Sequence, residues 1–386
     1  MPDISLTSIN SALEKKMDGT DSSSNLTDVL RLATSADDFT SSVFYIDSSY
    51  LPTDSAFIGT LARDNDGTVY AYDGSSWTRP NKDGSITLPY SFGGTTSGYM
   101  SGGRAAPPFS NTIDKWPFSS DGNATDVGDL TIARERGAGQ SSKVSGYASG
   151  GIGPSTNNNR IDKFSFAADG NATDVGDLTG TLRENAGQSS ENHGYTTGGH
   201  DGSPHPGEIN DIQKFSFASD GNATDVGDRT ITGQGHTGQN SLISGYSSAG
   251  STGNPPASTN VIDKFPFATD QNATDVGDLF ANALLGAGQS SSTHGYVSGG
   301  GTGPTNRETI QKFSFSSDEN ATDVGDLFSG AFFICGQSSD VSGYVSGGTP
   351  SPSANVIQKF PFPTDANGTD VGDLTQSRYG GMGQQI

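Results

Sequence analysis

Short stretches that alternate apolar and polar residues recur along most of the chain, separated by clusters of Gly, Asn, Asp and Ser. Residues 288–336 show the pattern well. Small residues dominate 288–291 and 294–300, whereas 309–315 alternates apolar and polar side chains and 322–327 is a shorter stretch between turns. Alternation of this length between turn-forming residues is typical of half-buried strands. The unit therefore predicts four short antiparallel strands, which we call A, B, C and D.

The same unit occurs six times. A tag of the form Asn-(Ala/Gly)-Thr-Asp-Val-Gly-Asp opens strand D in every copy, at intervals of 47 to 51 residues. A unit of this length built from short strands is one propeller blade, which cannot bury its faces alone and stacks on its neighbours. We therefore predict a mainly β fold with a six-bladed β-propeller over residues 85–386. The tags begin at Asn123, Asn171, Asn222, Asn272, Asn320 and Asn367.

The last copy of strand A lies at the C-terminus, where Gly383-Gln384-Gln385-Ile386 matches the glycine-rich start of the other units. We expect this segment to supply strand A to the first blade. Such pairing ties the ring shut and removes the open sheet edge on which other chains could add.

Two segments near the N-terminus, 5–17 and 25–33, carry apolar residues at helical spacing. Helices this short are marginal alone in water, so we expect them to need a partner surface. We divide this part into a helical anchor over 1–48 and a small β-meander collar over 49–84. The residues expected to make the attachment are Leu6, Ile9, Leu13, Leu26, Val29 and Leu30.

The two faces of the predicted disc differ in sequence. Strand alternation places the A–B and C–D turns on one face, where Asp-Gly-Asn recurs almost unchanged, and the B–C and D–A loops on the other. B–C loops differ in every blade, and loops that vary between repeats often mark a binding face, although exposed loops also drift freely. The loop residues suited to polar ligands are Arg104, Asn157, Asn158, His200, His205, Asn254 and Arg307.

Composition excludes some partners. The formal net charge is −22, which disfavours nucleic acid because phosphate binding needs clustered Lys and Arg. No stretch is apolar enough to cross a membrane, and the first ten residues lack the features of a secretory signal. We therefore expect synthesis in a cytoplasm and, for a protein acting outside the cell, release by another route.

Calcium is the sharpest metal candidate. The series Asp121, Asn123, Asp126 and Asp129, repeated in the other blades, offers oxygen ligands around a turn. The spacing is not that of an EF-hand and no glutamate completes it. Asp and Asn also favour such turns by bonding to their own backbone, which is the interpretation we prefer. We therefore predict no metal and no other cofactor.

No catalytic constellation emerges. Six-bladed sialidases need an arginine triad near the axis, whereas the axis-proximal strands here read Gly-Gln-Ser-Ser. No Ser-His-Asp or P-loop signature is present. Cys335 is the single cysteine and lies beside phenylalanines, so it forms neither an internal disulfide nor a Tyr–Cys copper site. We predict a protein that is not an enzyme.

The glycine doublets that end strand B, such as Gly102-Gly103 and Gly299-Gly300, resemble those of kelch-repeat propellers. The leader, with its Tyr-x-Tyr-Asp-Gly-Ser-Ser-Trp hairpin at 70–77, resembles attachment regions of bacteriophage tail-fibre proteins, and the combination is similar to structural proteins of marine phages. The resemblance implies a virion protein, fibre- or tail-associated, that binds other virion proteins through its N-terminus and a host glycan or receptor through its loops. It also implies a homo-oligomer, with a trimer as one option. The alternatives are a capsid or tail decoration without a host ligand and a secreted bacterial lectin-like scaffold.

Overall fold

The computed structural model divides the chain into two compact units, residues 1–89 and 90–386. The first contains a four-stranded sheet in the order β1-β2-β3-β4, in which β1 runs parallel to β2 and the other pairs are antiparallel. Its strands are β1 (Phe44–Tyr45), β2 (Leu61–Arg63), β3 (Val69–Tyr72) and β4 (Trp77–Thr78). The described residues are these four strands and 92–386, without 106–107, 204–206, 254–256, 303–304 and 350–354. Both predicted helices, with Leu6, Ile9, Leu13, Leu26, Val29 and Leu30, lie outside them.

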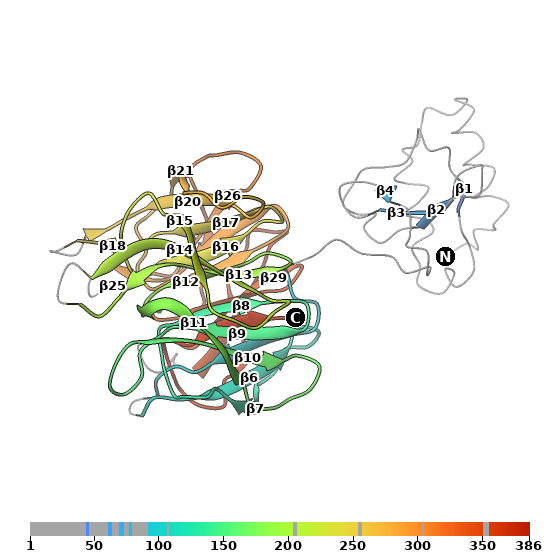
Figure 1. The fold of residues 1–386 in the computed structure, drawn as a ribbon. Coiled ribbons are helices and arrows are strands. Elements are labelled where there is room, and N and C mark those ends of the chain that lie inside the picture. Colours follow the sequence, from blue (N-terminus) through green and yellow to red (C-terminus); the bar gives the residue numbers. More distant parts are fainter. Residues whose placement is uncertain are drawn as a thin grey trace. The chain divides into compact units, whose positions relative to one another are not determined.

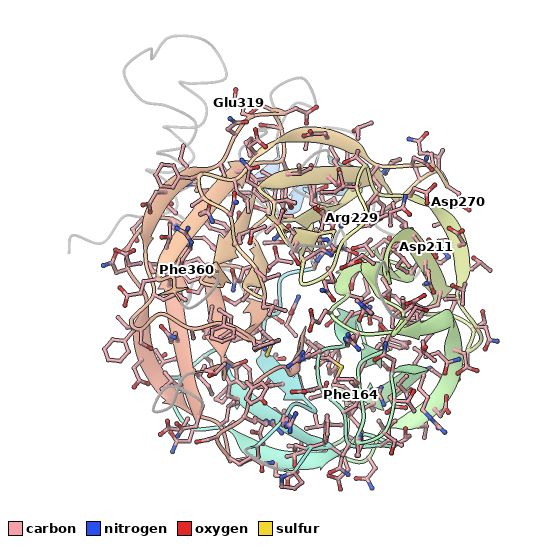
Figure 2. All side chains as sticks on the ribbon, turned by 90° about the vertical axis from the view of Figure 1, so that its left-hand side faces the viewer. Phe164, Asp211, Arg229, Asp270, Glu319 and Phe360 are labelled. Carbon is pink, nitrogen blue, oxygen red and sulfur yellow. The ribbon has the colours of Figure 1, made fainter. Side chains whose placement is uncertain are left out.

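The second unit is a six-bladed β-propeller (Figure 1), so the predicted fold class is confirmed. Each blade is a four-stranded antiparallel meander, and Figure 2 looks along the axis of the ring. Among the described residues no helix is long and apolar enough to span a membrane. Blade 1 has β32 (Met382–Gln385), β5 (Ser97–Ser101), β6 (Thr112–Pro117) and β7 (Thr125–Asp129); blade 2 has β8 (Ala138–Ser141), β9 (Ser145–Ser149), β10 (Asn158–Ser165) and β11 (Thr173–Leu182); blade 3 has β12 (Ala186–Ser189), β13 (His193–His200), β14 (Glu208–Ser216) and β15 (Thr224–Asp228).

Blades 4 and 5 carry an extra two-stranded hairpin in the B–C loop. These hairpins are β18 (Ser251–Thr252) with β19 (Ala257–Ser258), and β24 (Gly301–Thr302) with β25 (Thr305–Asn306). Blade 4 has β16 (Thr237–Asn240), β17 (Ser244–Ser248), β20 (Val261–Pro266) and β21 (Thr274–Asp278); blade 5 has β22 (Ala287–Ser290), β23 (His294–Ser298), β26 (Thr309–Ser314) and β27 (Thr322–Asp326); blade 6 has β28 (Cys335–Ser338), β29 (Ser342–Ser346), β30 (Val356–Pro361) and β31 (Thr369–Asp373).

The C-terminal strand closes the ring, as the repeat pattern predicted. Strand β32 pairs antiparallel with β5, so that the first blade is built from both ends of the propeller sequence. The last residue of the chain also bonds to the start of β5, because the amide groups of Thr96 and Ser97 donate to the carbonyl oxygen of Ile386.

Close packing at the axis explains the glycine and glutamine of strand A. A Cβ added to any of the six axial glycines would lie 2.0–2.2 Å from the carbonyl oxygen of the neighbouring one. The next residue is a buried glutamine whose Nε2 donates to the tyrosine carbonyl of the following blade, at 2.9–3.2 Å in all six blades. The glycines are Gly139, Gly187, Gly238, Gly288, Gly336 and Gly383.

The repeated tags staple one blade to the next. The asparagine that opens each tag accepts, through Oδ1, the backbone N–H of the last aspartate of the preceding blade, at 3.0–3.1 Å. The tyrosine of strand B packs on a phenylalanine of the following blade, as Tyr147 does on Phe217 with ring centroids 4.8 Å apart. Each strand C lysine forms an ion pair of 2.5–3.1 Å with the C–D turn aspartate of the following blade. These exposed pairs contribute little each, about 0.2–1 kcal/mol.

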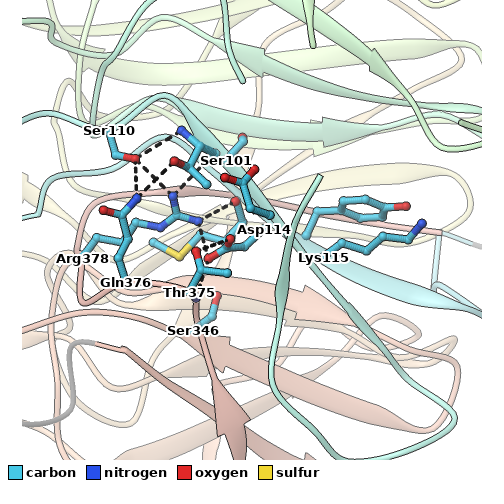
Figure 3. A network of polar contacts seen from close by, with 12 residues as sticks. Ser101, Ser110, Asp114, Lys115, Ser346, Thr375, Gln376 and Arg378 are labelled. Atoms are coloured by element: carbon cyan, nitrogen blue, oxygen red, sulfur yellow. Dashed lines mark hydrogen bonds and ion pairs between the residues drawn. The ribbon is translucent and has the colours of Figure 1, made fainter. Parts of the chain in front are cut away.

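A buried polar contact between blades comes in two versions. In the first, strand C carries an aspartate, and the preceding D–A loop supplies an arginine: Arg134 to Asp162 at 2.8 Å, Arg229 to Asp263 at 3.2 Å, and Arg378 to Asp114 at 2.9 Å. All six side chains are fully buried, and Figure 3 shows the third pair with Thr375 and Gln376 around it. In the second version strand C carries Gln213, Gln311 or Gln358, whose amides bond instead to backbone in the preceding strand D or in the loop after it.

Replacing Asp162 by glutamine alone should destabilise the propeller by about 3–5 kcal/mol, because the buried guanidinium of Arg134 loses its counter-ion. The double change Arg134→Leu with Asp162→Gln installs the residues found at the equivalent positions one blade on, Leu182 and Gln213. We expect the double variant to recover most of the loss. Urea unfolding of the two variants tests this. Equal losses of unfolding free energy in both would show that the two versions of the contact cannot replace each other.

Candidate binding face and its axial mouth

The six D–A loops meet in a closed ring around the axis. One residue of each loop donates its backbone N–H to the carbonyl of the equivalent residue in the preceding loop, at 2.6–3.0 Å, all the way round. These residues are Arg136, Glu184, Gly235, Leu285, Phe333 and Gly380. They lie on the face that also carries the B–C loops, which we call the individual face. The face with the A–B and C–D turns is the uniform face.

All six ring residues have the left-handed backbone conformation, with φ between 55° and 70°. Glycine takes this conformation freely, and it is used at 235 and 380. A side chain there costs about 1–2 kcal/mol, yet Arg136, Glu184, Leu285 and Phe333 hold it. Glycine at this position is sufficient for the fold, as Gly235 and Gly380 show. Four different side chains are therefore kept at the centre of the individual face at a cost in stability, which is typical of functional positions.

Their side chains surround a small hollow, which we call the axial mouth. The Nη1 atom of Arg136 lies 2.7 Å from Oε1 of Glu184, and the guanidinium stacks over the ring of Phe333 at 4.2 Å from its centroid. Leu285 completes the set by leaning over Gly235. The cavity measures about 70 Å³, and all six D–A loops line it. It offers a cation, an anion, an aromatic ring and an aliphatic side chain side by side, which suits a ligand with both apolar and hydroxyl or amide groups.

Two ionisable groups next to the mouth have shifted pKa values. Burial raises the pKa of Glu135, and the guanidinium groups of Arg136 and Arg104 oppose that shift from 3.5 and 3.7 Å. Burial also lowers the pKa of His236 well below its usual value, and the charge of Arg229, which contacts its Nε2, adds to the effect. His236 is therefore neutral near pH 7.

Below the mouth the axis is a narrow polar channel of about 50 Å³. Strand A lines it with glycine and with small polar residues that bond around the ring, as when the N–H of Ser141 donates to Ser189 Oγ at 3.0 Å. No charged side chain lines it among the residues that define this channel. Its uniform lining gives no basis for selecting a ligand.

The structure brings two of the predicted ligand-binding residues together. Asn157 donates through Nδ2 to the carbonyl oxygen of His200 at 3.0 Å, and both side chains are largely buried between blades 2 and 3. Nδ1 of His200 accepts the N–H of Gly202, so the imidazole orders its own loop. Burial lowers the pKa of His200. This pair therefore shapes the individual face and offers little surface to a ligand.

The other predicted ligand-binding residues are scattered. Arg104 lies beside the mouth, with its guanidinium 5.0 Å from the ring centroid of Phe109 and 3.7 Å from Glu135. Asn158 starts β10, and its Oδ1 accepts the N–H of Arg160 at 2.8 Å. Arg307 follows the β24–β25 hairpin of blade 5. His205 and Asn254 lie outside the described residues.

Of the four residues proposed as weak calcium ligands, Asp121, Asn123, Asp126 and Asp129, the first three have protein partners for a side-chain oxygen. Asp121 pairs with Lys359 at 3.1 Å, and Asn123 Oδ1 accepts the N–H of Asp373. Asp126 accepts the N–H of Gly128 through Oδ1 at 3.2 Å, and its counterparts Asp225 and Asp275 likewise accept the N–H two residues on. Across the described part of the propeller, three or more metal-ligating His, Cys, Asp or Glu side chains nowhere form a group.

The propeller is similar in fold to solved structures. One of them, titled "Structure of YjhT", matches with a TM-score of 0.55 and 14% sequence identity, covering 66% of this chain and 88% of that chain. It is one of 284 matching chains. No protein-family description and no curated protein sequence matches. At this identity the likeness shows the propeller fold alone.

Proposed function

We propose that this chain is a binding protein of a bacteriophage particle, attached through its N-terminal residues, whose individual face binds a glycan or receptor on the host surface. The observation that carries the proposal is the contrast between the two faces. On the uniform face the same ion pairs and asparagine bonds recur six times. On the individual face the central ring positions differ in chemistry and hold side chains in a strained conformation.

The place where the chain enters the propeller agrees with this proposal. Residues 92–96 run onto the propeller at the uniform face, where Gly94 bridges to Ser339 in the A–B turn of blade 6. The carbonyl oxygen of Phe92 accepts a bond from Gln385 at 3.0 Å, close to the axis. The described chain therefore enters the propeller at the uniform face, and the proposed binding face is the opposite face of the same disc.

We propose binding without catalysis. The carboxylate of Glu184 is held by Arg136, and that of Glu135 lies between two guanidinium groups, so both favour a charge-balanced, fixed surface. The kelch-like glycine doublets and the phage-like leader support a binding module on a particle. A decoration protein without a host ligand and a secreted lectin-like scaffold are the alternatives, and homo-oligomerisation, as a trimer for example, belongs to the same proposal.

The axial mouth gives the test. We expect the labelled full-length chain to bind at least one glycan on an array of bacterial surface glycans, and the double variant Arg136→Gly with Glu184→Gly to bind it at least about tenfold more weakly. Both changes install the residue already found at 235 and 380, so the melting temperature should move by less than about 5 °C. The bound glycan should be recovered uncleaved.

The matched control is the ion pair of Lys143 and Glu191, 2.7 Å long and exposed on the uniform face. Replacing both by serine, the residue at the equivalent position 292, should leave glycan binding unchanged. A wild-type chain that binds no glycan, or a mouth variant that binds as well as wild type, would contradict the proposal.

A further inference from the structure

Two phenylalanines outside the mouth are exposed at equivalent places in neighbouring blades. Phe280 and Phe328 each follow the last residues of strand D, and their side chains are 63% and 60% exposed. The buried residue before each one, Leu279 or Leu327, points into the core. We call Phe280 and Phe328 the rim pair. The four other blades have a threonine at this position: Thr131, Thr179, Thr230 and Thr375.

Three of these threonines form a hydrogen bond that a phenylalanine cannot form. Thr131, Thr230 and Thr375 donate through Oγ1 to the buried aspartates Asp162, Asp263 and Asp114, at 2.6–2.7 Å. After the rim pair, strand C carries glutamine, which bonds instead to the backbone of the next loop residue, Ala281 or Ser329. The amide of each glutamine accepts the N–H of this loop residue and donates to its carbonyl oxygen. The phenyl ring takes no part in these bonds and lies outside the core. Core packing therefore does not account for either phenylalanine.

A second feature occurs in the same two blades. Only blades 4 and 5 have a two-stranded B–C hairpin within the described residues. The loop that follows each rim residue contacts the end of the hairpin or the residues just after it. Asn282 donates through Nδ2 to the carbonyl oxygen of Ser258 at 3.0 Å in blade 4, and Gly330 lies against Glu308 in blade 5. An exposed ring followed by a loop that contacts the hairpin side of its blade therefore occurs in two neighbouring blades.

From this placement we infer that the rim pair forms two equivalent subsites for a neutral polysaccharide, each ring taking the C–H face of one sugar. An aromatic face carries partial negative charge and attracts the polarised C–H groups of a sugar, while flanking amide and carboxylate groups bond its hydroxyls. The net charge of −22 disfavours a polyanion. A repeating polymer reaches both subsites at once, so the second contact gains from effective concentration. This inference rests on the proposed glycan-binding function and adds a site away from the mouth.

The test uses the full-length chain in native gels that contain dextran, mannan or laminarin. We expect at least one of these polymers to retard the wild-type chain, and the double variant Phe280→Thr with Phe328→Thr to lose at least about tenfold in affinity. Each single variant should lose less than the double variant. Threonine is native at four equivalent positions, so folding should be preserved, and Phe→Tyr at both positions should retain the retardation.

The control is Ile243→Thr, which removes an exposed apolar side chain from an A–B turn, where blade 5 has Thr293. It should leave retardation unchanged. Retardation of the double threonine variant equal to that of wild type would overturn the rim subsites while leaving the mouth proposal in place. So would a wild-type chain that binds array glycans through its mouth but is retarded by none of the polymers. Absence of binding in both assays would overturn the glycan-binding function and the subsites together.

Discussion

Removing residues 382–386 is expected to unfold the propeller. Strand β32 is the innermost strand of blade 1, and Met382 and Gln384 are almost completely buried, at 1% and 0% exposed. Without it, β5 has an open edge on the axis, and Tyr147 loses the bond from Gln384 at 2.9 Å. The loss should exceed about 5 kcal/mol, which is comparable with the whole stability of many domains.

Circular dichroism and calorimetry of the truncated chain measure this effect. We expect no cooperative unfolding transition above room temperature, and partial recovery when a peptide with the sequence of residues 380–386 is added. A truncated chain that melts within about 5 °C of the intact one would show that the closure contributes little.

The substitution Gly238→Ala should have the next largest effect. The new Cβ would lie 2.0 Å from the carbonyl oxygen of Gly187, and the backbone on both sides belongs to strands that close the ring. No side-chain rotation relieves such a contact, so the strands must separate. A destabilisation of about 4 kcal/mol or more follows, at the upper end of what single substitutions do.

The matched control is Gly170→Ala in a C–D turn, where nothing lies within 4 Å of the added Cβ. It should change the free energy of unfolding by no more than about 0.5 kcal/mol. Urea titration of the two variants separates the outcomes. Equal stability of Gly238→Ala and Gly170→Ala would mean that the axis is less tightly packed than the structure shows.

The propeller and its closure could be predicted because they depend on repetition. Six copies of a strand pattern specify six blades, and the glycine-rich segment at 383 matched strand A in composition. The purpose of the Asn-Ala-Thr-Asp tag could not be obtained in that way. We interpreted it as turn chemistry, and the structure adds that Asn123 bonds to the backbone of another blade. That contact joins residues far apart in the sequence and depends on the register between blades, which no local sequence pattern specifies.

The pairing of Arg134 with Asp162 was missed although the sequence carries a signal for it. Strand C carries aspartate in three blades and glutamine in the other three, and each aspartate pairs with an arginine of the preceding D–A loop. Comparing each loop with the blade after it would have shown the correlation. The exposed phenylalanines at 280 and 328 fit the same correlation. Each occupies the position from which a threonine such as Thr131 bonds to a strand C aspartate, and each precedes a blade whose strand C carries glutamine.

The axial mouth could not be foreseen, since nothing in a residue such as Arg136 or Phe333 indicates a positive φ. Prediction favoured the longest and most variable loops instead. Of the residues chosen there, Asn157 and His200 are buried, and the Asn157 side chain bonds to the backbone of His200. Loop variability indicates the individual face, which stays a prediction, whereas the candidate site proposed on that face depends on how six short connections converge at the axis.

We propose above all that the chain belongs to a virus particle and binds the host surface through its individual face. Immunogold microscopy of purified particles tests it most directly, with an antibody raised to the B–C loop peptide of residues 200–211. We predict gold at the tail or fibre tips of intact particles. Unlabelled particles, with the protein detected by blot in cells or medium, would contradict the claim and favour the secreted lectin-like scaffold.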